Sequence, residues 1–185
     1  APRTFANGPA LWQAAWPALQ PDSHKYARGH AIAVSGPAES TGAIRLAARG
    51  ALRMGAGLVT IASPRAAFPV NATHLSAIML TPFDVPEGLG GVLADKRRNA
   101  VLIGPGCGVG PATGRMVKIA LASGAACVLD ADALTSFAAA PADDAAPVAT
   151  AGASFGYLPS SGSVAPITPV RLFDAIRATP ERPTV

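Results

Sequence analysis

Four glycines recur at every second position in a short segment that could bind a phosphate group, Gly104-Pro105-Gly106-Cys107-Gly108-Val109-Gly110. Glycine adopts positive φ angles at little cost and lets a ligand come close to the backbone. Pro111 follows and is suited to open a helix, whose N-terminus offers free N–H groups and the positive end of its dipole. The spacing matches neither a Walker A loop nor a clean dinucleotide fingerprint, so a tight strand-to-helix turn without a ligand is the alternative.

A second polar loop, residues 35–43, follows the first apolar run of the chain. Open α/β sheets bind ligands at the carboxyl ends of their strands, where such loops lie. Ser35, Glu39, Ser40 and Thr41 could therefore contact a ligand. Solvation of the loop and capping of the next helix account for the same residues equally well.

Two aspartates, Asp130 and Asp132, stand where a later apolar run ends. A carboxylate in that place could orient a hydroxyl group or a hydrated Mg²⁺ ion. Asp132 could instead cap the helix that follows, so a functional role is favoured for Asp130 over Asp132.

A cluster of His24, Lys25, Arg28 and His30 precedes the first apolar run. Two histidines without a third ligand make a poor metal site. Lys25 or Arg28 could pair with a phosphate, although a solvated surface position accounts for either residue taken alone. Cys107 has no neighbouring histidine or other base in the sequence, so nucleophilic catalysis by its thiol is not expected.

Alternating strands and helices must position these segments. Residues 31–35 predict a buried strand, residues 43–54 repeat apolar residues at helical spacing, and residues 58–62 predict a second strand. Further strands are expected at 76–80, 100–103 and 126–129, and further helices at about 66–75, 86–98 and 111–123, with another after Asp130. This alternation predicts a three-layer α/β fold with a doubly wound, mostly parallel sheet.

The composition excludes some classes of function. Half of the 185-residue chain is apolar, yet no apolar run approaches the roughly 18 residues that span a bilayer, so a soluble protein with no membrane role is expected. The net charge of +4 is dispersed, and basic clusters flanked by aromatic residues are absent, which argues against nucleic acid as a partner. The two cysteines fit neither a disulfide framework nor a metal site, and a cytoplasmic location is the resulting expectation.

Four regions are expected along the chain. Residues 1–23 predict a proline-rich linker or docking segment whose tryptophans share one face of a short helical turn. Residues 24–137 predict the N-terminal part of the α/β domain. Residues 138–170 are rich in Ala, Pro, Ser and Gly and predict an insertion or loop. Residues 171–185 predict a last helix and the start of a strand, at which the chain is expected to be truncated.

The chain resembles the NAD(P)H-hydrate dehydratase family over residues 5–137. The resemblance is specific through the combination of several segments rather than through any one of them. In chain order these are His24-Lys25-Tyr26-Ala27-Arg28-Gly29-His30, Thr41-Gly42-Ala43-Ile44-Arg45-Leu46-Ala47-Ala48, Leu52-Arg53-Met54-Gly55-Ala56-Gly57-Leu58-Val59, Ile103-Gly104-Pro105-Gly106-Cys107-Gly108 and Val128-Leu129-Asp130-Ala131-Asp132-Ala133-Leu134.

The resemblance implies a ribokinase-like fold and a lyase reaction in metabolite repair. Such enzymes use ADP or ATP with Mg²⁺ to phosphorylate the hydroxyl group of the hydrated nicotinamide ring of NADHX or NADPHX, and loss of phosphate restores NADH or NADPH. The family's substrate contacts map onto Ala43 and onto Gly106 or Gly108, small residues that admit a large dinucleotide. Lys25 and Asp130 complete the expected substrate-binding residues.

Later motifs of the family do not occur in this sequence, namely a Thr-Pro-His-Glu motif, a Lys-Gly pair and a Gly-Ser-Gly-Asp anion hole whose Asp is the catalytic base. The resemblance therefore places the catalytic aspartate and the nucleotide site beyond Val185, and the chain alone is expected to be inactive. Residues 7–12 look like the segment that follows an NAD(P)H-hydrate epimerase domain in bifunctional members. The family also tends to form homo-oligomers.

Other functions stay open at this point. A small-molecule kinase of the ribokinase superfamily, such as a thiamine-precursor kinase, would share the sheet and the nucleotide but yield a stable phosphorylated product. A non-catalytic nucleotide-binding fragment would serve only binding or assembly. A nicotinamide dehydrogenase is disfavoured because the first loop, residues 36–42, lacks the fingerprint spacing.

Overall fold

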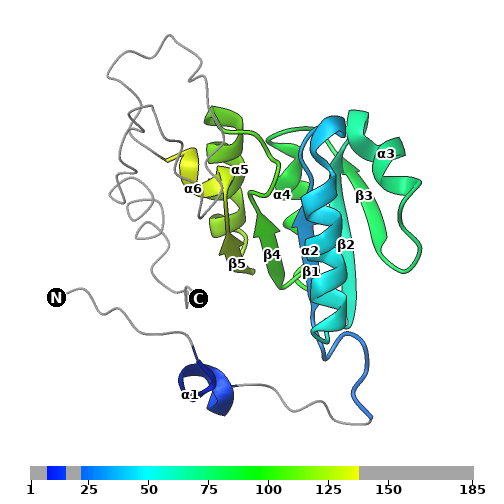
Figure 1. The fold of residues 1–185 in the computed structure, drawn as a ribbon, viewed down its shortest axis with the longest axis vertical. Coiled ribbons are helices and arrows are strands. Elements are labelled where there is room, and N and C mark those ends of the chain that lie inside the picture. Colours follow the sequence, from blue (N-terminus) through cyan, green and yellow to red (C-terminus); the bar gives the residue numbers. More distant parts are fainter. Residues whose placement is uncertain (1–7, 16–21, 138–185) are drawn as a thin grey trace, which may run out of the picture.

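A five-stranded, fully parallel sheet is the centre of the described structure (Figure 1). The computed structural model describes residues 8–15 and 22–137. The strands are β1 His30–Val34, β2 Leu58–Pro64, β3 Met79–Phe83, β4 Ala100–Ile103 and β5 Ala126–Leu129. Their order across the sheet is β3-β2-β1-β4-β5. The first strand thus lies in the middle, as in doubly wound folds.

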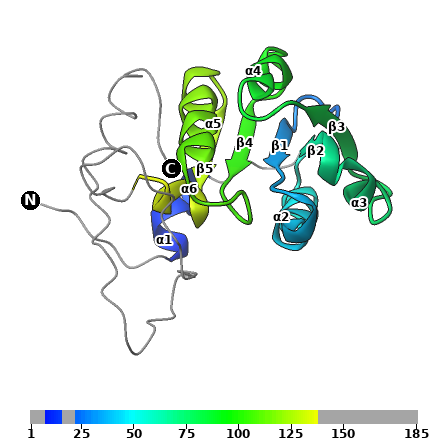
Figure 2. The same ribbon diagram turned by 90° about the horizontal axis from the view of Figure 1, so that it is seen from above.

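Helices cover both faces of this sheet (Figure 2). On one face lie α2 Gly42–Arg53 and α3 Phe68–Ala72, and on the other α4 Gly88–Leu93 and α5 Pro111–Ala122. Shorter segments are the helices α1 Pro9–Trp12 and α6 Asp132–Thr135 and the 3₁₀ turns η1 Gln13–Ala15, η2 Ala38–Ser40 and η3 Arg65–Ala67. The expected three-layer α/β architecture is therefore confirmed. No helix in the described ranges is long and apolar enough to cross a membrane.

An apolar stripe holds α2 against the sheet. Ile44 and Ala48 are fully buried and belong to one core cluster with Val59 and Ile61 of β2. Complete burial of an isoleucine or valine side chain contributes about 1.5–3 kcal/mol to stability. The helix stops before Gly55, whose φ of 109° is one that glycine adopts without steric cost.

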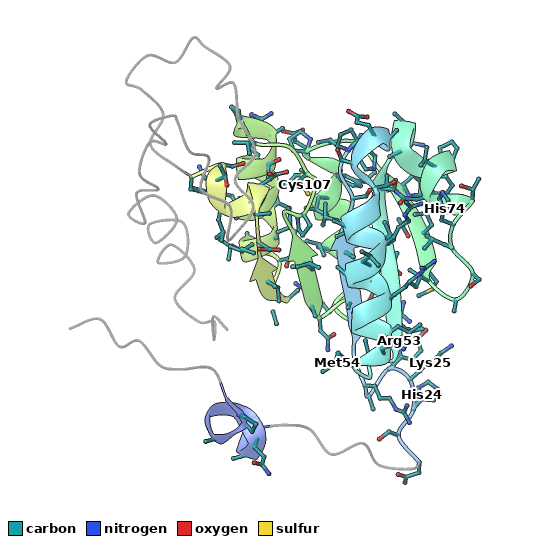
Figure 3. The ribbon with its side chains drawn as sticks, in the orientation of Figure 1. His24, Lys25, Arg53, Met54, His74 and Cys107 are labelled. Atoms are coloured by element: carbon teal, nitrogen blue, oxygen red, sulfur yellow. The ribbon has the colours of Figure 1, made fainter. Side chains whose placement is uncertain are left out.

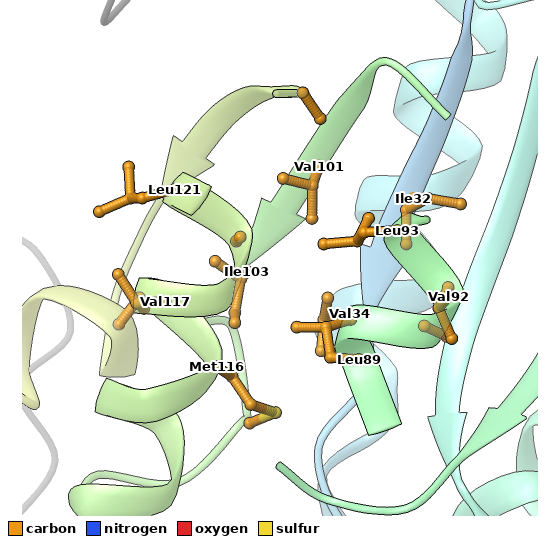
Figure 4. Close-up of a cluster of buried hydrophobic side chains, with 14 of the residues drawn as sticks. Ile32, Val34, Leu89, Val92, Leu93, Val101, Ile103, Met116, Val117 and Leu121 are labelled. Atoms are coloured by element: carbon orange, nitrogen blue, oxygen red, sulfur yellow. The ribbon is translucent and has the colours of Figure 1, made fainter. Parts of the chain in front are cut away.

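The larger core cluster fills the opposite face of the sheet (Figure 4). Ile32 and Val34 of β1 and Ile103 of β4 belong to it together with Leu89 of α4 and Val117 of α5. Strands of a parallel sheet are covered on both faces and therefore consist of nearly continuous apolar runs. This is why β1 and β4 lie within one residue of their expected positions, and the short apolar run of β5 is also where it was expected.

The expected strand at 76–80 is wrong in its bounds, because β3 spans Met79–Phe83. Parallel pairing with β2 begins at Met79, which is opposite Thr60, and it continues to Phe83. β3 is an edge strand, and Pro82 within it is tolerated because an edge strand pairs on one side only. The proline made the sequence of this strand resemble a loop.

Two expected helices are shorter than the sequence indicated. The segment 66–75 divides into η3 and α3. The segment 86–98 contains only α4 Gly88–Leu93, a helix with three glycines and hence low intrinsic helix propensity. A turn follows it, in which the side chain of Asp95 accepts a hydrogen bond from the backbone N–H of Arg97. The regions expected at 138–170 and 171–185 lie outside the described residues, as does most of 1–23.

Candidate functional site

Three loops meet at the carboxyl edge of the sheet, after β1, β4 and β5. β1 and β4 are neighbours, but the chain leaves β1 towards α2 on one face and β4 towards α5 on the other. Such a reversal of winding direction is the topological switch point of an open α/β sheet, where ligands bind. The glycine segment 104–110 and the polar loop 35–41 are the two loops at this point.

The loops after β1 and β4 touch through glycines. A Cβ atom built on Gly36 would lie far closer than 3.0 Å to the carbonyl oxygen of Gly106, and a Cβ on Gly106 would lie 2.5 Å from the carbonyl oxygen of Ser40. Gly106 also has a φ of 72°. The two backbones can therefore pack this closely only because both positions lack a side chain.

The loop after β5 joins the same contact through Gly104. This residue has a φ of 131°, and a Cβ on it would collide with the carbonyl oxygen of Asp130. The backbone N–H of Asp130 in turn donates to the carbonyl of Ile103 at 3.1 Å. The Asp130 side chain is exposed at this edge. Its backbone thus lies beside the start of the glycine segment.

Helix α6 fixes the outer half of the glycine segment. The N–H of Gly108 donates to Oδ2 of Asp132 at 2.8 Å, and the N–H of Gly110 donates to Oγ of Ser136 at 3.1 Å. Both amides are thus already paired within the protein. Asp132 therefore binds the backbone of the glycine segment and does not cap α6 as expected, because it is the first residue of that helix and Ala131 is its N-cap.

The N-terminus of α2 lies next to this segment and has no side-chain cap. Its N-cap residue Thr41 is buried, with no hydrogen bond from its side chain to the first turn. Gly42 and Ala43, the first two helical residues, are exposed. The first amides of a helix lack intrahelical acceptors and favour anions. The first turn of α2 therefore offers free amides beside the glycine segment.

Cys107 lies inside the glycine segment, and its thiol donates to the carbonyl of Val34 at 3.6 Å. Burial raises the pKa of this thiol to about 11, and the Asp132 carboxylate acts in the same direction. A thiol of that pKa is protonated at neutral pH, which makes it a poor nucleophile. The sequence-based expectation that Cys107 is not catalytic agrees with this environment.

The thiol of Cys107 should resist alkylation. In a Cys127→Ser background, we expect iodoacetamide to react slowly at pH 8 and much faster towards pH 11, where the thiolate forms. The free energy of unfolding should depend on the same ionisation. The pKa of the thiol is about 9.0 in the unfolded chain and about 11 in the folded one, so the native state loses stability as the pH rises between these values. Rapid labelling of the folded protein at pH 8 would contradict the burial of this thiol.

Comparisons with known proteins identify relatives of this chain. Residues 31–150 match a protein-family profile described as NAD(P)H-hydrate dehydratase. The bifunctional NAD(P)H-hydrate repair enzyme Nnr of Salinibacter ruber is 35% identical over 139 residues, which are 70% of this chain and 26% of that protein. The Nnr of Moorella thermoacetica is 38% identical over 144 residues, 69% of this chain and 27% of that protein.

The chain belongs to the NAD(P)H-hydrate dehydratase family. The profile covers more than half of its length. The resemblance expected from the sequence is thereby confirmed. The chain spans about a quarter of the length of these curated relatives.

Solved structures show the same fold. The ribokinase-like superfamily protein of Enterococcus faecalis superposes with a TM-score of 0.54 at 26% identity, covering 65% of this chain and 43% of that chain. The ADP/ATP-dependent NAD(P)H-hydrate dehydratase of Bacillus subtilis, co-crystallised with ATP and Mg²⁺, gives a TM-score of 0.52 at 27% identity, covering 64% and 42%. The ribokinase-like fold expected for this member of the family is confirmed.

Four of the five substrate-binding residues expected for this NAD(P)H-hydrate dehydratase family member come together at the carboxyl edge. They are Ala43, Gly106, Gly108 and Asp130. Lys25 does not join them, since Figure 3 shows it at the opposite end of the sheet from Cys107. The position of Lys25 follows from the order of the chain. Residues 24–29 lead into β1, so they must lie at the amino edge of a parallel sheet.

The basic cluster around Lys25 packs on itself at that amino edge. Its Nζ lies 5.5 Å from the centre of the Tyr26 ring, which also stacks on His24. His30 is buried, its Nε2 is 2.7 Å from Oγ1 of Thr60, and burial lowers its pKa. Within residues 8–15 and 22–137, no group of three His, Cys, Asp or Glu residues could hold a metal ion.

Sequence reasoning missed a buried polar group behind the first loop of this dehydratase-family domain. Asn71 of α3 is completely buried, and its Nδ2 donates to Oγ of Ser35 and to Oγ of Ser63, each at 3.0 Å. The available signal was a lone asparagine in the otherwise apolar helix α3. A buried amide in such a place needs partners, so its neighbours had to be polar.

A backbone strain lies between the two aspartates of this family member. Ala131 has a φ of 44° and a ψ of −116°, a conformation that costs a residue with a Cβ about 1–3 kcal/mol. We expect Ala131→Gly to stabilise the domain by about 1 kcal/mol after the entropy cost of glycine is subtracted. Ala122→Gly, at the exposed end of α5, should instead destabilise it. If both variants lowered the free energy of unfolding in guanidinium chloride equally, Ala131 would not be strained.

Proposed function

We propose that the full-length protein containing this chain is a lyase that converts the hydrates of NADH and NADPH back to the reduced dinucleotides, with consumption of ADP or ATP. Family membership supports the reaction. The observation that carries the placement of the substrate is the glycine contact between the loops after β1 and β4, next to the uncapped N-terminus of α2.

Each residue in this proposal has a separate role. The first amides of α2 bind the pyrophosphate, because they are free and at the positive end of the helix dipole. Ala43 and Gly106 are small enough to let the dinucleotide lie against the backbone. Gly108 contributes through the shape of its loop, since its N–H is already bonded to Asp132. Asp130 accepts a hydrogen bond from a hydroxyl group of the substrate.

The nucleotide and Mg²⁺ belong to the proposal on the strength of the resemblance and of the Bacillus subtilis structure with ATP and Mg²⁺. The described residues do not fit a metal site, because Asp130 is a single exposed carboxylate and Asp132 is bonded to the backbone. We assign the binding sites for ADP or ATP and for Mg²⁺ to other parts of the full-length protein. The catalytic base also belongs to those parts.

Product analysis tests the reaction. The full-length protein is incubated with (S)-NADH hydrate and either ADP or ATP, and the absorbance of reduced nicotinamide and free phosphate are followed together. We expect both to rise, and neither to rise without nucleotide. A stable phosphorylated product would favour the small-molecule kinase. No product with either nucleotide, from a protein shown to be folded, would contradict the proposal.

The wider setting is also proposed. We infer an NAD(P)H-hydrate epimerase domain in the same polypeptide, because the relatives from Salinibacter and Moorella are bifunctional repair enzymes. A homo-oligomer in the cytoplasm completes the proposal. Epimerisation of (R)-NADH hydrate by the full-length protein, and its mass in solution, test the first two statements.

A further inference from the structure

The buried amide of Asn71 links two strands at the edge that carries the candidate site. Its Nδ2 donates to Ser35, directly after β1, and to Ser63, within β2. Ser35, Ser63 and Asn71 are all at most 1% exposed. Because the whole group is removed from water, each hydrogen bond in it is worth more than a surface bond and its loss costs more.

The direction of the hydrogen bonds is fixed by their partners. The hydroxyl of Ser35 donates to the carbonyl of Gly36 at 3.1 Å, and the hydroxyl of Ser63 donates to the carbonyl of Pro64 at 3.1 Å. Each hydroxyl has one hydrogen, so it must accept from Asn71. One chain of bonds therefore runs from Asn71 through Ser35 to Gly36, and a second runs through Ser63 to Pro64.

The first of these two chains ends in the loop of the candidate site, and the second connects to that loop only indirectly, through η3. Gly36 is the residue that packs against the backbone of Gly106, and the turn η2 after it packs against α3 as well as η3. Pro64 instead leads into η3. The buried amide of Asn71 is thus connected through Ser35 to the loop that leads to Thr41 and the start of α2.

We propose that Asn71 is a positioning residue for hydrate binding, which acts through Ser35 on the loop between β1 and α2. This inference rests on the proposed function. Loss of the amide lets the loop shift relative to Gly106, so the first amides of α2 and the glycine segment no longer fit the same dinucleotide. Misplacement of a binding group by a small distance is enough to cost a large factor in rate.

The test compares two serines that bind the same amide. In the full-length protein we expect Ser35→Ala to raise the KM for NADH hydrate about tenfold. Asn71→Asp should have the same effect, because a carboxylate of equal size cannot donate and turns the Ser35 hydroxyl away from Gly36. The KM for the nucleotide should stay constant. Ser63→Ala is the matched control, and it should lower the melting temperature without changing the KM for the hydrate.

Each outcome decides the inference. A KM for the hydrate within twofold of the parent in both Ser35→Ala and Asn71→Asp overturns it. An equal rise with Ser63→Ala, or an equal rise in the KM for the nucleotide, also overturns it, since general loosening would then be the cause. If Asn71→Asp does not fold, Ser35→Ala against Ser63→Ala gives the answer. Inactivity of the parent protein would instead refute the proposed function and is recognised before any variant is made.

Discussion

Replacing Gly36 with alanine should destabilise the domain by more than about 3 kcal/mol, the upper range for overpacking. The added Cβ would lie far inside 3.0 Å of the Gly106 carbonyl oxygen, and the nearest atoms all belong to the backbone. A flexible side chain could move away from a methyl group, whereas this contact is between the backbones of two loops that leave adjacent strands. Hydrate turnover should be lost with it, because the contact shapes the site.

The control for this change is Gly50→Ala in the middle of α2. A Cβ there meets no atom within 4 Å, so alanine should stabilise the helix by about 0.5–1 kcal/mol. Unfolding in guanidinium chloride compares the two variants directly. A cost below about 1 kcal/mol for Gly36→Ala would mean that the loops after β1 and β4 are not packed as described.

The second large effect is expected for Ala43→Leu. Ala43 is exposed in the first turn of α2, beside the glycine segment, so a longer side chain should change the fold little. It should fill the space that the dinucleotide occupies and lower kcat/KM for the hydrate by about 100-fold, or about 2.7 kcal/mol. The loss should lie mainly in the KM.

Ala122→Leu is the matched change at the far edge of the sheet. Ala122 is exposed and is the last residue of α5. The glycine segment precedes the first residue of this helix, so Ala122 lies at the end far from the candidate site. Steady-state kinetics of the full-length protein should show parent values for this variant. Similar losses for both leucine variants would indicate a stability effect, and no loss for Ala43→Leu would remove this residue from the site.

The fold was largely predictable because most of its strands are short apolar runs between polar or glycine-containing loops. The apolar runs at β1, β4 and β5 have no helical period, and α2 has a clear one, so type and order of these elements followed from the sequence. β3 was displaced by three residues because an edge strand with Pro82 has less apolar character. The order of strands across the sheet was not predictable from periodicity, which carries no information on neighbours.

The site was predictable only where a motif marks a loop. The glycine segment was recognisable from its spacing, whereas Ala43 was predicted from the family resemblance alone. The contact of Gly36 with Gly106 joins residues far apart in the chain, and nothing local indicates it. Asn71 acts through hydrogen bonds to two serines on different strands, which a sequence shows only as scattered polar residues. The prediction for Lys25 considered the positive charge of its side chain but not its position before β1, which puts it at the amino edge of the sheet.

A crystal structure of the full-length protein with the hydrate of NADPH bound would locate the substrate site. We expect the dinucleotide to lie at the carboxyl edge of the sheet, in contact with both Ala43 and Gly106, with its pyrophosphate at the N-terminus of α2. A dinucleotide bound at the amino edge, beside Lys25 and Tyr26, or one that contacts only one of the two loops, would contradict it.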